Sequence, residues 1–151
     1  MDLSFQVQAK IQKPLGVVFD AIHNPETLSV YFTTGGASGV PKEGTKALWR
    51  FADFPGDFPI FVKKVIPNEL LVFEWEALGR FGERRGYNTR VEMSFESLDQ
   101  GSTLVRISES GWKETQEGLD SSYGNCHGWT QMLCCLKAYV EYGIILRRGY
   151  F

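Results

Sequence analysis

The sequence of 151 residues predicts an α+β protein built on an antiparallel sheet. Three observations carry this prediction. A strand pattern opens the chain and two short helical patterns follow it, a run of strand patterns then continues without intervening helices, and one long helical pattern ends the chain. A parallel sheet would instead alternate strands and helices. We therefore expect an antiparallel sheet of about six or seven strands and a long C-terminal helix.

The first third of the chain predicts one strand and two short helices. Residues 3–11 alternate polar and apolar side chains, which is typical of a strand with one buried face. Pro14 suits a first helical position, and the helical apolar stripe after it stops near residues 23–25. Residues 26–32 indicate a second short helix. Residues 33–44 contain four Gly and one Pro, which indicates a loop or an irregular edge strand.

The middle of the chain predicts a succession of strands. They are expected at residues 45–51, 58–66, 70–76, 87–97 and 103–109. The Pro-Gly-Asp sequence at residues 55–57 predicts a turn before the second of them, and the charged, glycine-bearing residues 78–86 predict a mobile loop. Alternation places Val91, Met93 and Phe95 on the inward face of their strand.

The final helix is expected from about residue 121 to about residue 147. At 100° per residue, one stripe of this helix faces the sheet. Its members are Trp129, Met132, Leu133, Leu136, Val140 and Gly143.

The same helical segment contains all three cysteines and His127. His127 and Cys134 share a side of the helix, but seven residues separate them by about 10 Å along the axis. Zinc ligands must all reach within about 2.3 Å of one ion, and a nucleophile must hydrogen-bond to its base. We therefore predict no metal site, no cofactor and no Cys–His catalysis here; the cysteines are expected to be small packing residues.

Composition and charge argue against several classes of protein. The net charge of −2 gives no basic face for nucleic acid. No run approaches the ~18 apolar residues of a membrane span, and the N-terminus has no signal-peptide pattern. Three cysteines in one segment are no disulfide framework, so we expect a cytoplasmic protein. The length indicates a single domain over residues 1–151.

Five segments resemble one family, in its order and over nearly the whole chain. They are "VFDAIHNPETLSVYF" (18–32), "PKEGTKALWRF" (41–51), "VKKVIPNELLVFEW" (62–75), "GSTLVRISESGW" (101–112) and "GWTQMLCCLKAYVEYG" (128–143). The chain is similar to the START/Bet v 1-like superfamily, and within it to the activator of Hsp90 ATPase homologue 1-like group. It departs from the pattern at residues 52–61 and in the tail at residues 145–151.

The resemblance implies a helix-grip fold, in which the curved sheet wraps the long helix around a core or a cavity. The inward residues are then candidates for binding a ligand, with Tyr87 and Glu109 among the polar ones. The full set is Trp49, Phe51, Phe61, Phe73, Trp75, Tyr87, Met93, Phe95, Glu109, Trp129, Leu133 and Leu136. Arg85 and His127 are further polar candidates for the cavity mouth.

Four functions follow as hypotheses. The leading one is a binder of a small hydrophobic molecule, whether a lipid, a polyketide-like or an aromatic compound, without catalysis. The second is a cyclase-, dehydratase- or hydrolase-type enzyme that uses the same cavity, with Glu109, Tyr87 or His127 as acid or base. The third is an Hsp90-type chaperone interaction module. The fourth is a homodimer or other assembly formed through the aromatic tail Tyr150-Phe151 and the Phe54/Phe58 loop.

Overall fold

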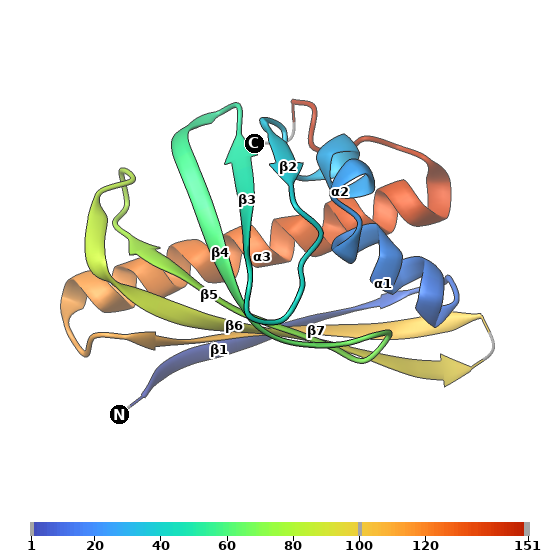
Figure 1. The fold of residues 1–151 in the computed structure, drawn as a ribbon, viewed down its shortest axis with the longest axis horizontal. Helices are drawn as coiled ribbons and strands as arrows, with labels where there is room; N and C mark the ends of the chain where they lie inside the picture. Colours follow the sequence, from blue (N-terminus) through green and yellow to red (C-terminus); the bar gives the residue numbers. More distant parts are fainter. Residues whose placement is uncertain (1, 100, 150–151) are drawn as a thin grey trace.

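The computed structural model describes residues 2–99 and 101–149 and confirms the expected α+β class (Figure 1). Strand β1 (Leu3–Ile11) is followed by helices α1 (Leu15–His23) and α2 (Pro25–Tyr31). The other strands are β2 (Gly36–Ser38), β3 (Lys46–Phe51), β4 (Phe54–Ile66), β5 (Leu70–Leu78), β6 (Arg84–Asp99) and β7 (Ser102–Trp112). The long helix α3 spans Gln116–Tyr142.

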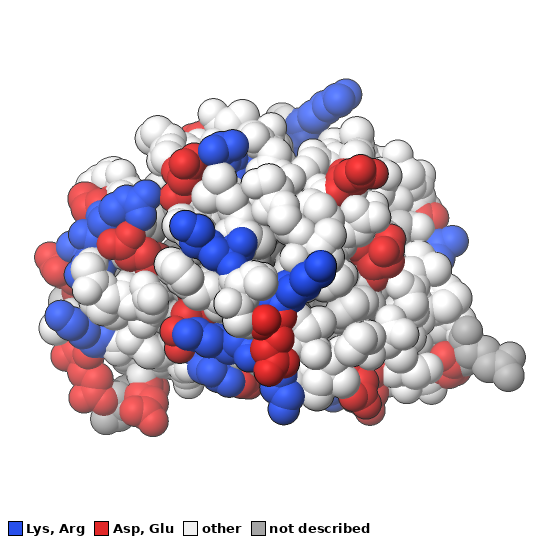
Figure 2. Space-filling model, viewed as in Figure 1, with Lys and Arg blue, Asp and Glu red and all other residues white. Residues whose placement is uncertain are grey.

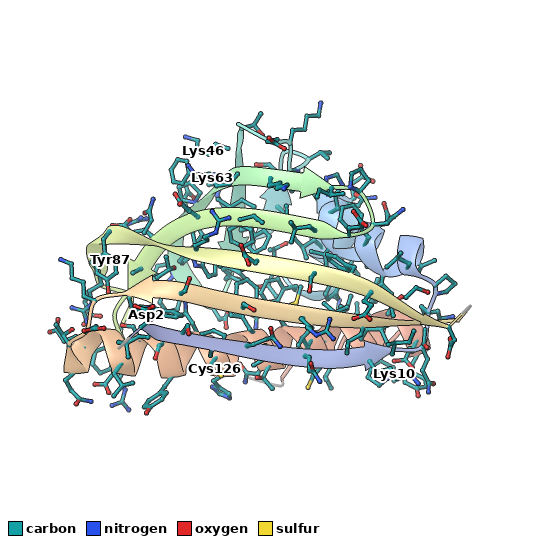
Figure 3. The ribbon with its side chains drawn as sticks, turned by 90° about the horizontal axis from the view of Figure 1, so that it is seen from below. Asp2, Lys10, Lys46, Lys63, Tyr87 and Cys126 are labelled. Atoms are coloured by element: carbon teal, nitrogen blue, oxygen red, sulfur yellow. The ribbon has the colours of Figure 1, made fainter. Side chains whose placement is uncertain are left out.

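The seven strands form one antiparallel sheet in the order β1-β7-β6-β5-β4-β3-β2. The sheet curves around one side of α3, and α1 and α2 lie beside the C-terminal half of that helix (Figure 1). Seen from its outer face, β1, β7, β6 and β5 run side by side, with α3 beyond the β1 edge (Figure 3). This is the helix-grip arrangement that the sequence predicts.

The final helix is displaced from its expected bounds at both ends. It begins after Thr115, whose side chain accepts a hydrogen bond from the Gly118 backbone N–H at 3.0 Å. It ends at Gly143, which has φ of 67° and acts as a left-handed C-cap. The prediction of a helix over residues 121–147 is therefore wrong, because it passes over these two capping signals. Gly143 is an exposed cap and not a member of the buried stripe.

The hairpin between β3 and β4 also differs from the expectation. Its turn is at Ala52 and Asp53, and Pro55 lies inside β4. Arg50 pairs with Asp57 whereas Phe51 pairs with Phe54, so two extra residues bulge out of the β4 ladder. The loop expected over residues 78–86 is shorter as well, because β5 continues to Leu78 and β6 starts at Arg84.

The expected inward direction of Phe61 is wrong. Phe61 is 38% exposed, while Ile60 on the neighbouring position is fully buried. The register explains this, because Phe61 pairs with the exposed Lys46 and Ile60 pairs with the buried Ala47. Directly paired residues share one face of a sheet, so β3 dictates which β4 residues face the helix.

The core lies between the inner face of the sheet and the buried face of α3. Trp49, Phe73, Met93, Phe95 and Leu136 all belong to it. Acidic and basic side chains are interspersed over the viewed face of the molecule (Figure 2). Within the described part of the chain, none of the helices combines the length and the apolar character needed to cross a membrane. The aromatic tail Tyr150-Phe151 lies outside the described residues.

Candidate functional site

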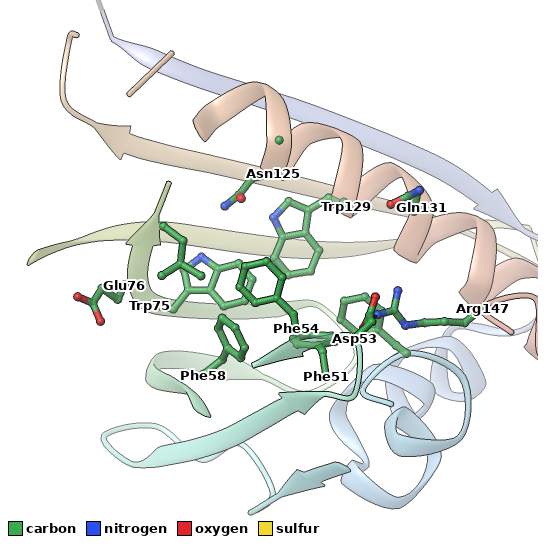
Figure 4. Close-up of a pocket in the computed structure, with 14 residues that line it drawn as sticks. Phe51, Asp53, Phe54, Phe58, Trp75, Glu76, Asn125, Trp129, Gln131 and Arg147 are labelled. Atoms are coloured by element: carbon green, nitrogen blue, oxygen red, sulfur yellow. The ribbon is translucent and has the colours of Figure 1, made fainter. Parts of the chain in front are cut away.

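A cavity of about 230 Å³ lies between α3 and the ends of strands β3, β4 and β5 (Figure 4). Its apolar walls are aromatic, and its polar lining comes from the hairpin turn, from β5, from α3 and from the tail. The lining residues are Phe32, Phe51, Asp53, Phe54, Phe58, Trp75, Glu76, Leu78, Gly124, Asn125, Gly128, Trp129, Gln131 and Arg147.

The aromatic walls are built from rings on separate elements. Trp75 from β5 and Trp129 from α3 are stacked, with centroids 5.3 Å apart and planes at 30°. On the hairpin side, the Phe58 ring lies 5.5 Å from Phe51 and 5.7 Å from Phe54. Aromatic pairs of this kind add about 0.5–1.5 kcal/mol each beyond area burial, so the walls of the cavity are mutually supported.

Glu109 fixes the two stacked tryptophans from behind. Its carboxylate accepts hydrogen bonds from Trp75 Nε1 at 2.9 Å and from Trp129 Nε1 at 2.7 Å. Thr89 Oγ1 donates to Glu109 Oε1 at 2.6 Å, and Asn125 Nδ2 contacts both carboxylate oxygens at 3.0 and 3.1 Å. The residue is 1% exposed and is not part of the cavity lining. Glu109 therefore contacts three of the side chains that do line the cavity, Trp75, Asn125 and Trp129.

The environment of Glu109 sets its ionisation. Burial raises the pKa of the Glu109 carboxyl above its ordinary value, and the hydrogen bonds from Thr89, Trp75, Trp129 and Asn125 oppose that rise. The two indoles and the amide nitrogen can only donate, so they are matched by the acceptor oxygens of this carboxyl group. The cost of burying this polar group is offset by donors that also orient the cavity walls.

One side of the cavity is formed by the bare surface of α3. A Cβ atom built at Gly124 or at Gly128 would meet nothing within 4 Å. Glycine inside a helix costs roughly 0.5–1 kcal/mol relative to alanine. Close packing of the protein against itself does not explain these two glycines, and their effect is to leave the helix backbone open to the cavity.

The C-terminal tail and the turn between β3 and β4 meet at this cavity. Arg147 from the tail donates from Nη2 to Asp53 Oδ1 in the β3–β4 turn at 2.8 Å. The Arg147 guanidinium also lies 5.6 Å from the centroid of Phe51 and 5.9 Å from that of Phe32. The Arg147 side chain is 7% exposed and that of Asp53 is 50% exposed. The pair thus forms the rim of the cavity, with its cation inside and its carboxylate facing solvent.

The structure places the predicted site residues in different environments. Phe51, Trp75 and Trp129 line the cavity. Fully packed core positions are occupied by Trp49, Phe73, Met93, Phe95, Leu133 and Leu136. Glu109 is buried behind the cavity, and Phe61 faces outward.

Tyr87 lies apart from this cavity, in a second hollow near the start of α3 that Arg84, Arg85 and Lys113 also line. The Lys113 ammonium lies 5.0 Å from the centroid of the Tyr87 ring, and Arg85 pairs with Glu117 at 3.3 Å. His127 is exposed on α3. The expectation that Tyr87, Arg85 and His127 share the mouth of one cavity with Glu109 is therefore wrong.

The cysteines occupy three different environments on α3. Cys134 is exposed, Cys126 is half-buried and Cys135 is buried. Burial raises the pKa of the Cys135 thiol to about 11. Among residues 2–99 and 101–149, no three His, Cys, Asp or Glu side chains gather as a metal site would require.

Sequence reasoning misses several lining residues for identifiable reasons. Phe54 and Phe58 are expected in a surface loop, yet the bulged start of β4 turns them inward to the cavity. Asn125 carries no periodic signal, because it is a polar residue beside the buried stripe. The glycines on both sides of it, at residues 124 and 128, are the available signal: two glycines four residues apart inside a helix need a reason.

The architecture defines a helix-grip α+β protein with an aromatic cavity between its sheet and its C-terminal helix. The chain belongs to the family of Activator of Hsp90 ATPase homolog 1-like proteins, whose model matches residues 12–141. This confirms the resemblance carried by the five sequence segments. A search of curated proteins finds no match.

Solved structures share the fold at low sequence identity. The protein SSP2350 from Staphylococcus saprophyticus superposes with a TM-score of 0.77 at 23% identity, over 96% of each chain. The Aha1 dimer from Colwellia psychrerythraea gives a TM-score of 0.72 at 22% identity, over 93% of this chain and 98% of that one. DynU16, from the dynemicin biosynthetic locus, gives 0.77 at 20% identity; the match covers 93% of this chain and 48% of DynU16.

Proposed function

We propose that the protein binds a small hydrophobic compound with aromatic rings in the cavity between the sheet and α3. The observation that carries this proposal is the combination of aromatic walls with an unfilled helix face at Gly124 and Gly128. Apolar pockets with a few placed polar groups are the usual form of small-molecule sites. Walls made of aromatic side chains favour an aromatic ligand over a flexible lipid, because a rigid ring stacks on them at little cost in conformational entropy.

The volume of the cavity limits the size of the ligand that it can hold. A cavity of about 150 Å³ takes one benzene ring. The space here is about 230 Å³, which suits two fused rings. The cytoplasmic location, a homodimer and an Hsp90-type partner stay predictions from the sequence and its family.

Calorimetric titration with 2-naphthol tests the proposal. We expect binding with a micromolar dissociation constant. Gly128→Leu should abolish it, because the new side chain fills the cavity. His127→Leu adds the same side chain at the preceding, exposed position of α3 and should leave binding intact. Absence of heat at millimolar 2-naphthol, or equal binding by both variants, would overturn the proposal.

A further inference from the structure

The orientation of the Asn125 amide is fixed by its neighbour. Its Nδ2 reaches Glu109 Oε1 at 3.0 Å and Oε2 at 3.1 Å. Both carboxyl oxygens already accept hydrogen bonds from Trp75, Thr89 and Trp129, so the donating NH₂ end of the amide faces them. The carbonyl oxygen Oδ1 is therefore the end of Asn125 that Glu109 does not engage.

The Asn125 side chain lies where a ligand in the cavity can contact it. Asn125 is half-buried and lines the cavity, between Gly124 and Gly128 on α3. Both glycines present no side chain, and a Cβ at either would meet nothing within 4 Å. The stacked pair of Trp75 and Trp129 lines the same cavity. A flat ring lying on the bare helix surface beside this pair would bring its edge to the Asn125 amide (Figure 4).

The chemistry of an oriented acceptor selects among ligands of equal shape. A ligand with an O–H or N–H at its edge can donate to Asn125 Oδ1. A ligand of the same shape without that proton desolvates the oxygen and leaves it unpaired, which costs free energy. Sites built around a buried hydrogen-bonding group reject analogues that lack the matching group far more strongly than they reject small changes in apolar size.

We infer that Asn125 determines the specificity of this cavity, which takes a flat bicyclic aromatic compound carrying a hydrogen-bond donor, such as a phenolic hydroxyl, in preference to its O-methylated analogue. Glu109 is the positioning residue that orients the amide. This inference rests on the proposed function, since it concerns the ligand of the same cavity.

The test compares 2-naphthol with 2-methoxynaphthalene by calorimetric titration. The wild-type protein should bind 2-naphthol at least about fivefold more tightly, the worth of one net hydrogen bond. Asn125→Leu keeps a similar side-chain volume and should bring the two dissociation constants to parity by weakening 2-naphthol alone. His127→Leu, at an exposed position of the same helix outside the cavity lining, should keep the wild-type preference.

A second measurement needs no variant. In a ¹H–¹⁵N correlation spectrum of the wild-type protein, the Asn125 side-chain amide should shift with 2-naphthol and much less with 2-methoxynaphthalene. Equal affinities for the two compounds in the wild type, or a preference that Asn125→Leu keeps, would overturn the inference and leave the proposed function standing. Binding of neither compound would overturn both.

Discussion

Arg147 Nη2 lies 2.8 Å from Asp53 Oδ1, and this ion pair joins the C-terminal tail to the turn between β3 and β4. The tail and this turn are therefore held together although they lie far apart in the sequence. Arg147 is the buried member of the ion pair, and its guanidinium also lies over the rings of Phe32 and Phe51. A long arginine side chain stabilises such a site through its stem and its guanidinium plane as well as through its charge.

This relationship predicts how substitutions at position 147 affect stability. Arg147→Ala should lower the free energy of unfolding by about 1–3 kcal/mol, because it removes two cation–π contacts and the packed stem. Arg147→Met keeps most of the stem and should recover about half of the loss. Urea denaturation measures both variants. Equal losses for the two would contradict the packing explanation and assign the effect to the charge.

The Glu109 network predicts a pH dependence of stability. Because burial raises the pKa of Glu109 in the folded protein, the folded state retains its proton to a higher pH than the unfolded state does. The stabilising contribution is complete below the unfolded pKa of about 4.3 and is lost as pH rises through the folded pKa. Glu109→Gln removes this titrating group. The amide nitrogen of the new glutamine is a donor that faces other donors, so the variant is also less stable than the wild type at every pH.

Urea denaturation of wild type and Glu109→Gln between pH 4 and pH 8 measures this effect. The advantage of the wild type over the variant should shrink as pH increases, and then level off. An advantage that grows with pH would mean that the hydrogen bonds to Glu109 outweigh its burial and that folding lowers the pKa of this carboxyl.

The glycines of α3 predict opposite effects of one substitution. Gly124→Ala and Gly128→Ala should each raise the free energy of unfolding by about 0.5–1 kcal/mol, since the added Cβ meets nothing and alanine favours helix. Gly118→Ala in the same helix should lower it, because its Cβ would clash with the backbone carbonyl oxygen of Lys113. Thermal denaturation separates the two cases, and destabilisation by alanine at residue 128 would show that this surface is already filled.

The cysteines predict an order of chemical reactivity. Iodoacetamide should label Cys134 first, Cys126 more slowly and Cys135 only after unfolding, because exposure falls in that order and burial raises the pKa of Cys135 to about 11. Peptide mass spectrometry over a time course checks the order. Labelling of Cys135 in the folded protein as fast as that of Cys134 would contradict the packing of α3.

Periodicity predicts much of this fold because most elements have one buried face. The alternation of β6 places Val91, Met93 and Phe95 inward as expected, and the stripe of α3 holds at Trp129 and Leu136. Helix-grip topology follows from the order of elements. The bounds of α3 do not, because its ends are fixed by capping at Thr115 and Gly143 and not by the apolar stripe.

The cavity is harder to predict than the fold, since it depends on register and on contacts between distant segments. Periodicity within β4 alone cannot show that Phe61 pairs with Lys46 and faces outward. The approach of Arg147 to Asp53 joins residues 94 positions apart, and neither residue carries a local signal for it. The hydrogen bonds of Glu109 reach four residues on three other elements, so its inward phase is predictable and its partners are not.

The most direct test of ligand binding in this cavity is a ¹H–¹⁵N correlation spectrum of the tryptophan indoles during titration with 2-naphthol. Trp75 and Trp129 line the cavity, whereas Trp112 stacks on Phe5 at 5.5 Å at the far edge of the sheet and serves as an internal control. We predict saturable shifts of the Trp75 and Trp129 signals while the Trp112 signal stays in place. Signals that do not move, or that all move alike without saturation, would contradict binding at this site.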